Sequence, residues 1–138
     1  MSKGNLLIVD DEAEIREMLG RHFEFDEYTV FHAEDGKAAL EVLSTVKIDV
    51  VISDIVMPRM TGVELLEVIN KEYPMTRCIM MTGYVTQSHL LKCMQFHAET
   101  VIFKPIEDLA EMEEAVADSL ASLQLWKDKL KVLQGLKH

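Results

Sequence analysis

Five polar residues stand directly after apolar segments of the chain, where their side chains could act together. Asp10 and Asp11 follow the first such segment, Asp54 ends a central one, and Thr82 and Lys104 follow two later ones. If the segments are parallel strands, their carboxyl ends meet at one edge of a sheet. Three carboxylates gathered there would repel one another unless a cation neutralises them. Because Mg²⁺ prefers carboxylates, waters and phosphate oxygens, the set matches a magnesium and phosphoryl site.

Thr82 and Lys104 add what a phosphoryl group needs beside a metal ion. The threonine supplies a hydroxyl donor and the lysine a compact positive charge. An aspartate beside such groups can attack phosphorus and form an acyl phosphate, and the candidate nucleophile is Asp54. Taken singly, an acid or threonine after a strand is usually a helix cap or turn residue, and the lysine could be a solvated strand end. Because the five residues stand at the same end of four predicted strands, a shared phosphoryl site is favoured over five separate cap or turn residues.

The segments that must position these residues alternate between strand-like apolar runs and stretches with the spacing of a helix. Apolar, β-branched runs predict strands at residues 5–9, 28–33, 48–54, 77–81 and 100–103. Helical spacing predicts five helices: at residues 15–23, after Asp35-Gly36, after residue 61, at residues 88–96 and from Ile106 onward. Thr61 and Glu64 are spaced as a capping box that opens the third helix. Leu90, Leu91 and Met94 are expected on the apolar side of the fourth. Such alternation with short connections predicts an α/β fold, a parallel sheet with helices on both faces.

The segment IDVVISD at residues 48–54 is predicted to be a central strand. Its apolar residues are β-branched and do not alternate with polar ones, which indicates that both faces are covered. The acid at its end, Asp54, therefore stands where open α/β sheets bind their ligands.

Length and composition indicate one acidic domain. A chain of 138 residues, 49% hydrophobic and 28% charged, can form one packed core but not two ordinary domains. Its net charge of -10 argues against nucleic acid or an anionic membrane as a direct partner. The two cysteines, Cys78 and Cys93, are expected to be buried reduced thiols. Without a signal peptide or a run of ~20 apolar residues, the protein is expected to be cytoplasmic.

The motifs around the polar residues resemble the receiver domain of bacterial two-component response regulators, including chemotaxis receivers. They are VDD (Val9 to Asp11), DIVMP (Asp54 to Pro58), MTG (Met81 to Gly83) and FKP (Phe103 to Pro105). The resemblance covers residues 4–118 and leaves residues 119–138 as a helical extension, a linker or coiled coil. It implies a flavodoxin-like three-layer α/β/α sandwich with strand order 2-1-3-4-5.

The resemblance also implies a role for each acid. Asp54 would accept a phosphoryl group from the phosphohistidine of a sensor histidine kinase. Asp11 and Asp54 would coordinate Mg²⁺ with the backbone carbonyl of Val56, and Asp10 would act mainly through water. Catalysis would be limited to the domain's own phosphoryl transfer and hydrolysis.

On the other side of the site, Thr82 and Lys104 would bind the phosphoryl oxygens, and the Lys104–Pro105 peptide is expected to be cis. Phosphorylation would draw both residues inward and shift the population between two arrangements of the surface around the fourth helix and fifth strand. That shift would control an output domain or partner.

One position near the site departs from the family's usual pattern, and two others vary within the family. Many receivers carry an aromatic residue three positions before the lysine, and Val101 stands there. Tyr84 or Phe103 could substitute for the missing aromatic switch, or could be ordinary strand-end or core aromatics. Val56 and Tyr84 occupy the variable positions that flank the phosphorylation site, where an apolar and a bulky side chain should hinder the approach of water. We therefore expect slow dephosphorylation.

The C-terminal helix is expected to run beyond a receiver's usual end near Leu120, toward Gln134, with Gly135 as its stop. Residues seven apart fall at the a and d positions of a heptad: Leu109, Val116, Leu123 and Leu130, with Met112, Ser119, Trp126 and Leu133. The first half could pack on its own domain. The rest would project, and it could pair with a second chain as a homodimer, dock to another domain or remain exposed.

Two other functions are alternatives to that of a receiver domain. An aspartyl-phosphate phosphatase of the haloacid dehalogenase type usually has an aspartate two residues after its nucleophile, and Val56 stands there. An unphosphorylated dimerisation module would not need the intact acids, threonine and lysine.

Overall fold

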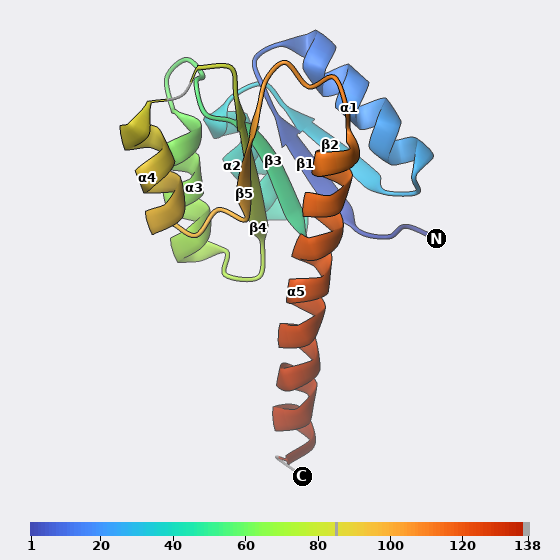
Figure 1. Cartoon of the computed structure of the whole chain (residues 1–138). Coiled ribbons are helices and arrows are strands. Elements are labelled where there is room, and N and C mark those ends of the chain that lie inside the picture. Colours follow the sequence, from blue (N-terminus) through green and yellow to red (C-terminus); the bar gives the residue numbers. More distant parts are fainter. Residues whose placement is uncertain (85, 137–138) are drawn as a thin grey trace.

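A five-stranded parallel sheet forms the middle layer of the fold, as the computed structural model shows for residues 1–84 and 86–136 (Figure 1). The strands follow the order β2-β1-β3-β4-β5, and every neighbouring pair is parallel. The predicted flavodoxin-like topology is therefore confirmed. The strands are β1 (Asn5–Val9), β2 (Thr29–Ala33), β3 (Val50–Asp54), β4 (Arg77–Thr82) and β5 (Thr100–Phe103).

Two helical layers cover the sheet. The helices are α1 (Ala13–Phe25), α2 (Gly36–Thr45), α3 (Gly62–Glu72), α4 (Gln87–Gln95) and α5 (Ala110–Leu136). One hydrophobic core packs α2, α3 and α4 against one face, and a second packs α1 and α5 against the other. Figure 1 shows the sheet between these layers. All five residues of β3 are buried, which confirms that it is a central strand covered on both faces.

Local capping signals in the sequence explain where two helices begin. The side chain of Asp35 accepts a hydrogen bond from the Ala38 amide at the start of α2. At the start of α3, Thr61 and Glu64 form the predicted capping box, each side chain accepting from the other residue's amide. Such caps satisfy amides that have no partner inside the helix, so short stretches of sequence suffice to predict them.

Several expectations about the helices and strands were wrong. Strand β3 begins at Val50 rather than at residue 48, although Ile48 is buried. The side chain of α4 that is buried is Cys93, whereas Leu91 and Met94, expected on the apolar side, are exposed. Helix α5 begins at Ala110 rather than at Ile106, because the Asp108 side chain accepts from the Ala110 amide and opens the helix there.

Helix α5 has two different halves. In the first half the heptad positions Met112, Val116, Ser119 and Leu123 are buried in the domain. In the second half Trp126, Leu130 and Leu133 are about half exposed, and the helix projects beyond the sheet (Figure 1). Lys127 Nζ lies 3.7 Å from Asp49 Oδ1 where the helix leaves the domain.

The stop expected at Gly135 was wrong, because α5 continues to Leu136. A glycine lowers helix stability by only about 1 kcal/mol, so it does not by itself end a helix. Residues 137 and 138 of the expected extension lie outside the described residues. None of the helices within the described residues combines the length and the hydrophobicity of a membrane-spanning segment.

Candidate functional site

The carboxyl ends of the strands bring the predicted polar residues to one edge of the sheet. Asp10 directly follows β1, Asp54 and Thr82 are the last residues of β3 and β4, and Lys104 directly follows β5. These strands are adjacent and parallel, so residues far apart in the sequence become neighbours. Strand β2 lies at the far edge and contributes none of them.

Lys104 is the centre of the arrangement. Its Nζ donates to Asp10 Oδ2 at 2.9 Å and to Asp54 Oδ2 at 3.0 Å. Both carboxylates are buried, Asp10 completely. A third carboxylate, Glu12 Oε1, lies 3.5 Å from the same nitrogen but is exposed. The lysine thus bridges the two strand ends that the sequence analysis placed together.

Burial and charge act in opposite directions on these groups. Burial raises the pKa of Asp10, and hydrogen bonds from the Glu12 amide and Lys104 offset this only in part. Burial alone would lower the pKa of Lys104, but hydrogen bonds and charges of Asp10 and Asp54 outweigh it and raise that pKa. The lysine therefore stays protonated among acids, and the cluster still carries more negative than positive charge.

The donor set fits a hard divalent cation. Oxygen atoms of Asp10, Asp11, Glu12 and Asp54 all lie within 4.8 Å of one another. Two of these acids are buried, and burying carboxylates without enough positive charge is costly. Mg²⁺ binds through one or two carboxylates and keeps several of its own waters, and this cluster offers the carboxylates.

Thr82 is buried, and its hydroxyl is already engaged. The Thr82 Oγ1 donates to the carbonyl of Tyr84 at 2.8 Å and accepts from the amide of Tyr84 at 3.1 Å. Its backbone carbonyl accepts from the Lys104 amide at 2.8 Å, so the ends of β4 and β5 are tied together. The hydroxyl can serve another acceptor only by giving up its bond to the Tyr84 carbonyl.

The loop between β3 and α3, residues 55–61, folds back over the end of β3. The Val56 amide donates to Asp54 Oδ1 at 3.4 Å, and the Val56 side chain is about half exposed. At the end of this β3–α3 loop, the Gly62 amide donates to the Ile55 carbonyl at 2.8 Å. A Cβ on Gly62 would lie 2.8 Å from Ile55 Cα and even nearer the Asp54 carbonyl oxygen. Glycine is required here for close approach.

The candidate switch residues lie around the fifth strand. Val101 is half-buried against the hydrophobic core that lies between the sheet and helices α2, α3 and α4. Tyr84 and Phe103 are exposed by 69% and 58%, so neither is a core aromatic. The Lys104–Pro105 peptide is cis, as expected.

Sequence reasoning missed two side chains at this edge. Glu12 approaches Lys104 and belongs to the acidic cluster, and its position directly after Asp10 and Asp11 was the available signal. Arg16 Nη1 donates to the Asp10 carbonyl at 2.6 Å, and only the first turn of α1 brings it there.

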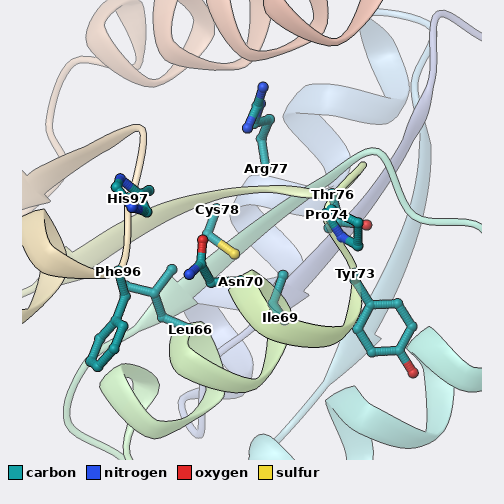
Figure 2. A pocket seen from close by; sticks show the side chains of 10 residues that line it. All are labelled: Leu66, Ile69, Asn70, Tyr73, Pro74, Thr76, Arg77, Cys78, Phe96 and His97. Atoms are coloured by element: carbon teal, nitrogen blue, oxygen red, sulfur yellow. The ribbon is translucent and has the colours of Figure 1, made fainter. Parts of the chain in front are cut away.

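Hollows in the surface lie at both ends of the sheet. One beside the site is lined by Glu12, Ile15, Met18, Lys104 and Ile106 among others, so apolar surface of α1 adjoins the lysine. Figure 2 shows another, between the end of α3, the start of β4 and the residues after α4. It includes Arg77 and Cys78 at the amino end of β4, so it lies away from the acidic cluster.

Comparisons with known proteins agree with this geometry. A family model, the response regulator receiver domain, matches residues 6–117. "Regulator of RpoS" of Escherichia coli K12 is 35% identical over 111 residues, which are 80% of this chain and 33% of that protein. The chain therefore spans about a third of the length of the first curated relatives that it matches.

Two solved structures extend the comparison. A CheY-like receiver domain of Methanospirillum hungatei is 28% identical with a TM-score of 0.85, covering 89% of this chain and 98% of that one. The response regulator TrrA of Thermotoga maritima, solved in complex with Mg²⁺-BeF, is 30% identical with a TM-score of 0.76, covering 86% and 99%.

Proposed function

The chain belongs to the family of response regulator receiver domains, and from this we propose that it is a switch operated by phosphorylation of Asp54. The observation that carries the proposal is the position of Lys104, whose nitrogen contacts both Asp10 and Asp54 at the ends of β1 and β3. A cation beside a carboxylate at this edge suits the transfer of a negatively charged phosphoryl group.

In the proposed reaction, a carboxylate oxygen of Asp54 bonds to phosphorus while the phosphorus–nitrogen bond of a kinase phosphohistidine breaks. The imidazole leaves and takes up a proton. Lys104 holds positive charge beside the transferred oxygens. Mg²⁺, held by Asp11, Asp54 and the Val56 carbonyl with Asp10 acting through water, would neutralise charge on the phosphoryl oxygens.

Phosphorylation is proposed to work through Thr82. A phosphoryl group on Asp54 offers strong acceptor oxygens, which compete with the Tyr84 carbonyl for the threonine hydroxyl. If Thr82 changes partner, the backbone of Tyr84 is released and the segment after β4 can rearrange. Because Val101 offers no aromatic ring, exposed Tyr84 and Phe103 are the available aromatic reporters of this change.

Dephosphorylation is proposed to be slow. Val56 and Tyr84, at the family's variable positions, are exposed by 49% and 69%. An apolar and a bulky side chain there would hinder an attacking water. A rapid measured decay of the phosphorylated form would refute this part of the proposal.

The partners are also proposals. A sensor histidine kinase would donate the phosphoryl group in the cytoplasm, and residues 119–138 would form an extension beyond a receiver unit of residues 4–118, linking it to an output domain or partner. In this extension Trp126, Leu130 and Leu133 are exposed at heptad positions, which favours homodimer pairing through the distal half of α5. Sedimentation that finds only monomers, with and without a phosphate mimic, would refute pairing.

Incubation with acetyl phosphate and Mg²⁺ tests the central proposal. Wild-type protein should gain one base-labile phosphoryl group by mass spectrometry, whereas Asp54→Ala and the closer Asp54→Asn should gain none. Asp128→Asn, an exposed change in the distal half of α5, is the matched control and should behave as wild type. Equal modification of the Asp54 variants would refute the assignment.

The same experiment separates the other functions. An unphosphorylated dimerisation module would gain no phosphoryl group. The family match gives no support to a haloacid dehalogenase phosphatase, and Val56 stands where that class usually has its second aspartate. Phosphoryl transfer to and from Asp54 is the only catalysis proposed.

A further inference from the structure

An ion pair joins the β3–α3 loop to the start of α2, an element that contributes no residue to the acidic cluster. Arg59 Nη1 donates to Asp35 Oδ2 at 3.0 Å. The other carboxylate oxygen of Asp35 accepts from the Ala38 amide at 2.9 Å, which caps α2. The Asp35 side chain is only 11% exposed, so its charge is largely removed from water. One buried carboxylate thus serves both a helix and the loop.

The next residue of the loop makes a second contact with α2. Met60 packs against Gly36, where a Cβ would lie 2.6 Å from the Met60 Sδ and 2.9 Å from its Cβ and Cγ. Met60 is also half-buried against the core under α2 and α3. The first residue of α2 therefore admits the methionine only because it is glycine.

The backbone between these contacts is unusual. Arg59 has φ 70°, a left-handed conformation that is unfavourable for a residue with a side chain. Such conformations persist where the surroundings hold them in place. The Asp35 ion pair and the Met60 contact are the surroundings that hold Arg59 here.

We propose that Asp35 and Arg59 form a positioning pair for the phosphorylation site, holding the β3–α3 loop in the conformation that presents Val56 to the metal. The proposal rests on the proposed function, in which the Val56 carbonyl is a metal ligand. Neither residue touches the reacting atoms. The pair acts by keeping residues 56–60 docked on α2, so the corner after β2 supports a site to which it gives no ligand.

The expected effect is local. Arg59 is 78% exposed, so solvent screens its charge and the ion pair should contribute only weakly to the stability of the whole domain. Opening of this loop alone requires no unfolding of the sheet. Loss of the pair should therefore change the protection of loop amides and the affinity for Mg²⁺ by about threefold to fivefold, with little change in global stability.

Two conservative variants test the proposal. Asp35→Asn keeps an oxygen that can cap α2 but removes the charge, and Arg59→Asn removes the cation with a residue that tolerates positive φ. Amide hydrogen exchange in metal-free protein reports on Met60 and Gly62, whose amides donate to Pro58 and Ile55 carbonyls. Isothermal titration with Mg²⁺ gives the dissociation constant.

We expect each variant to exchange these loop amides faster and to bind Mg²⁺ three to five times more weakly, and the double variant to be no worse than either single one. The control is Asp26→Asn, which breaks the exposed Lys3–Asp26 pair of 2.9 Å and should match wild type. Unchanged loop protection overturns the proposal. Faster exchange with unchanged Mg²⁺ affinity also overturns it, because the pair would then hold the loop without serving the site.

Failure of the proposed function gives a different result. Wild-type protein that binds no Mg²⁺ would overturn the metal site itself and, with it, the positioning role. Because hydrogen exchange is measured without metal, it still shows whether the ion pair holds the loop. The two failures are therefore distinguishable.

Discussion

Replacement of Gly62 by alanine should damage the protein at the point where the β3–α3 loop closes on β3. The added Cβ would lie 2.8 Å from Ile55 Cα and 2.9 Å from the Asp54 carbonyl carbon, and nearer still to the Asp54 carbonyl oxygen. All three atoms belong to the backbone of the central strand or of the residue after it. No side-chain rotation can relieve the contact, so the loop or the strand end must move.

The size of the effect follows from two opposing terms. Alanine at the first residue of α3 would gain at most about 1 kcal/mol of helix propensity over glycine. Overpacking against well-packed atoms costs about 1–3 kcal/mol, and more where backbone must shift. Movement also strains the hydrogen bond from the Gly62 amide to the Ile55 carbonyl, 2.8 Å long. We expect a net loss of about 1–3 kcal/mol in the free energy of unfolding.

Urea unfolding followed by circular dichroism measures this loss. A change of that size should lower the midpoint by about 1–2 M urea. Gly83→Ala is the matched control, because its Cβ would meet the Lys104 Cβ at an ordinary 3.5 Å, and it should stay within about 0.5 kcal/mol of wild type. A Gly62→Ala midpoint equal to that of wild type would refute the close-approach argument.

Two further predictions follow from burial. Burial raises the pKa of Asp10 above its ordinary 3.8, so the folded protein binds this proton more tightly than the unfolded chain does. Protonation of Asp10 therefore stabilises the fold fully below pH 3.8, and this stabilisation is lost as the pH rises through the pKa of the folded state. Asp10→Asn, measured by urea unfolding without divalent cations, should therefore be more stable than wild type at neutral pH and lose this advantage as pH falls toward 3.8. A less stable variant at neutral pH would contradict this prediction. Burial also raises the pKa of the Cys78 thiol to about 12. Iodoacetamide at mildly alkaline pH should therefore modify Cys78, detected by peptide mass spectrometry, in urea but not in the folded protein, and equal rates in both would disprove this protection.

The sequence predicted most of the fold because its signals are short-range. The bounds of β1 and β5 match the predicted ranges, and the capping box of α3 needs only residues three apart. Strand order followed from motifs at the strand ends that resemble one family. Errors arose where tertiary packing overrides local pattern: α4 buries Cys93 rather than Leu91 or Met94, because only the side chain facing the core of α3 and the sheet becomes buried.

For the candidate site, too, some features were predictable from the sequence and others only from the tertiary structure. The sequence by itself determined which polar residues lie at the carboxyl end of the sheet, since alternation of strands and helices places all strand ends at one edge. Only the tertiary structure decided their partners: Lys104 lies between Asp10 and Asp54, and the hydroxyl of Thr82 bonds to the Tyr84 backbone. The ion pair between Asp35 and Arg59 likewise could not be predicted from the sequence. These residues are 24 apart in the chain and meet only when two loops pack together, and no local sequence pattern indicates such a contact.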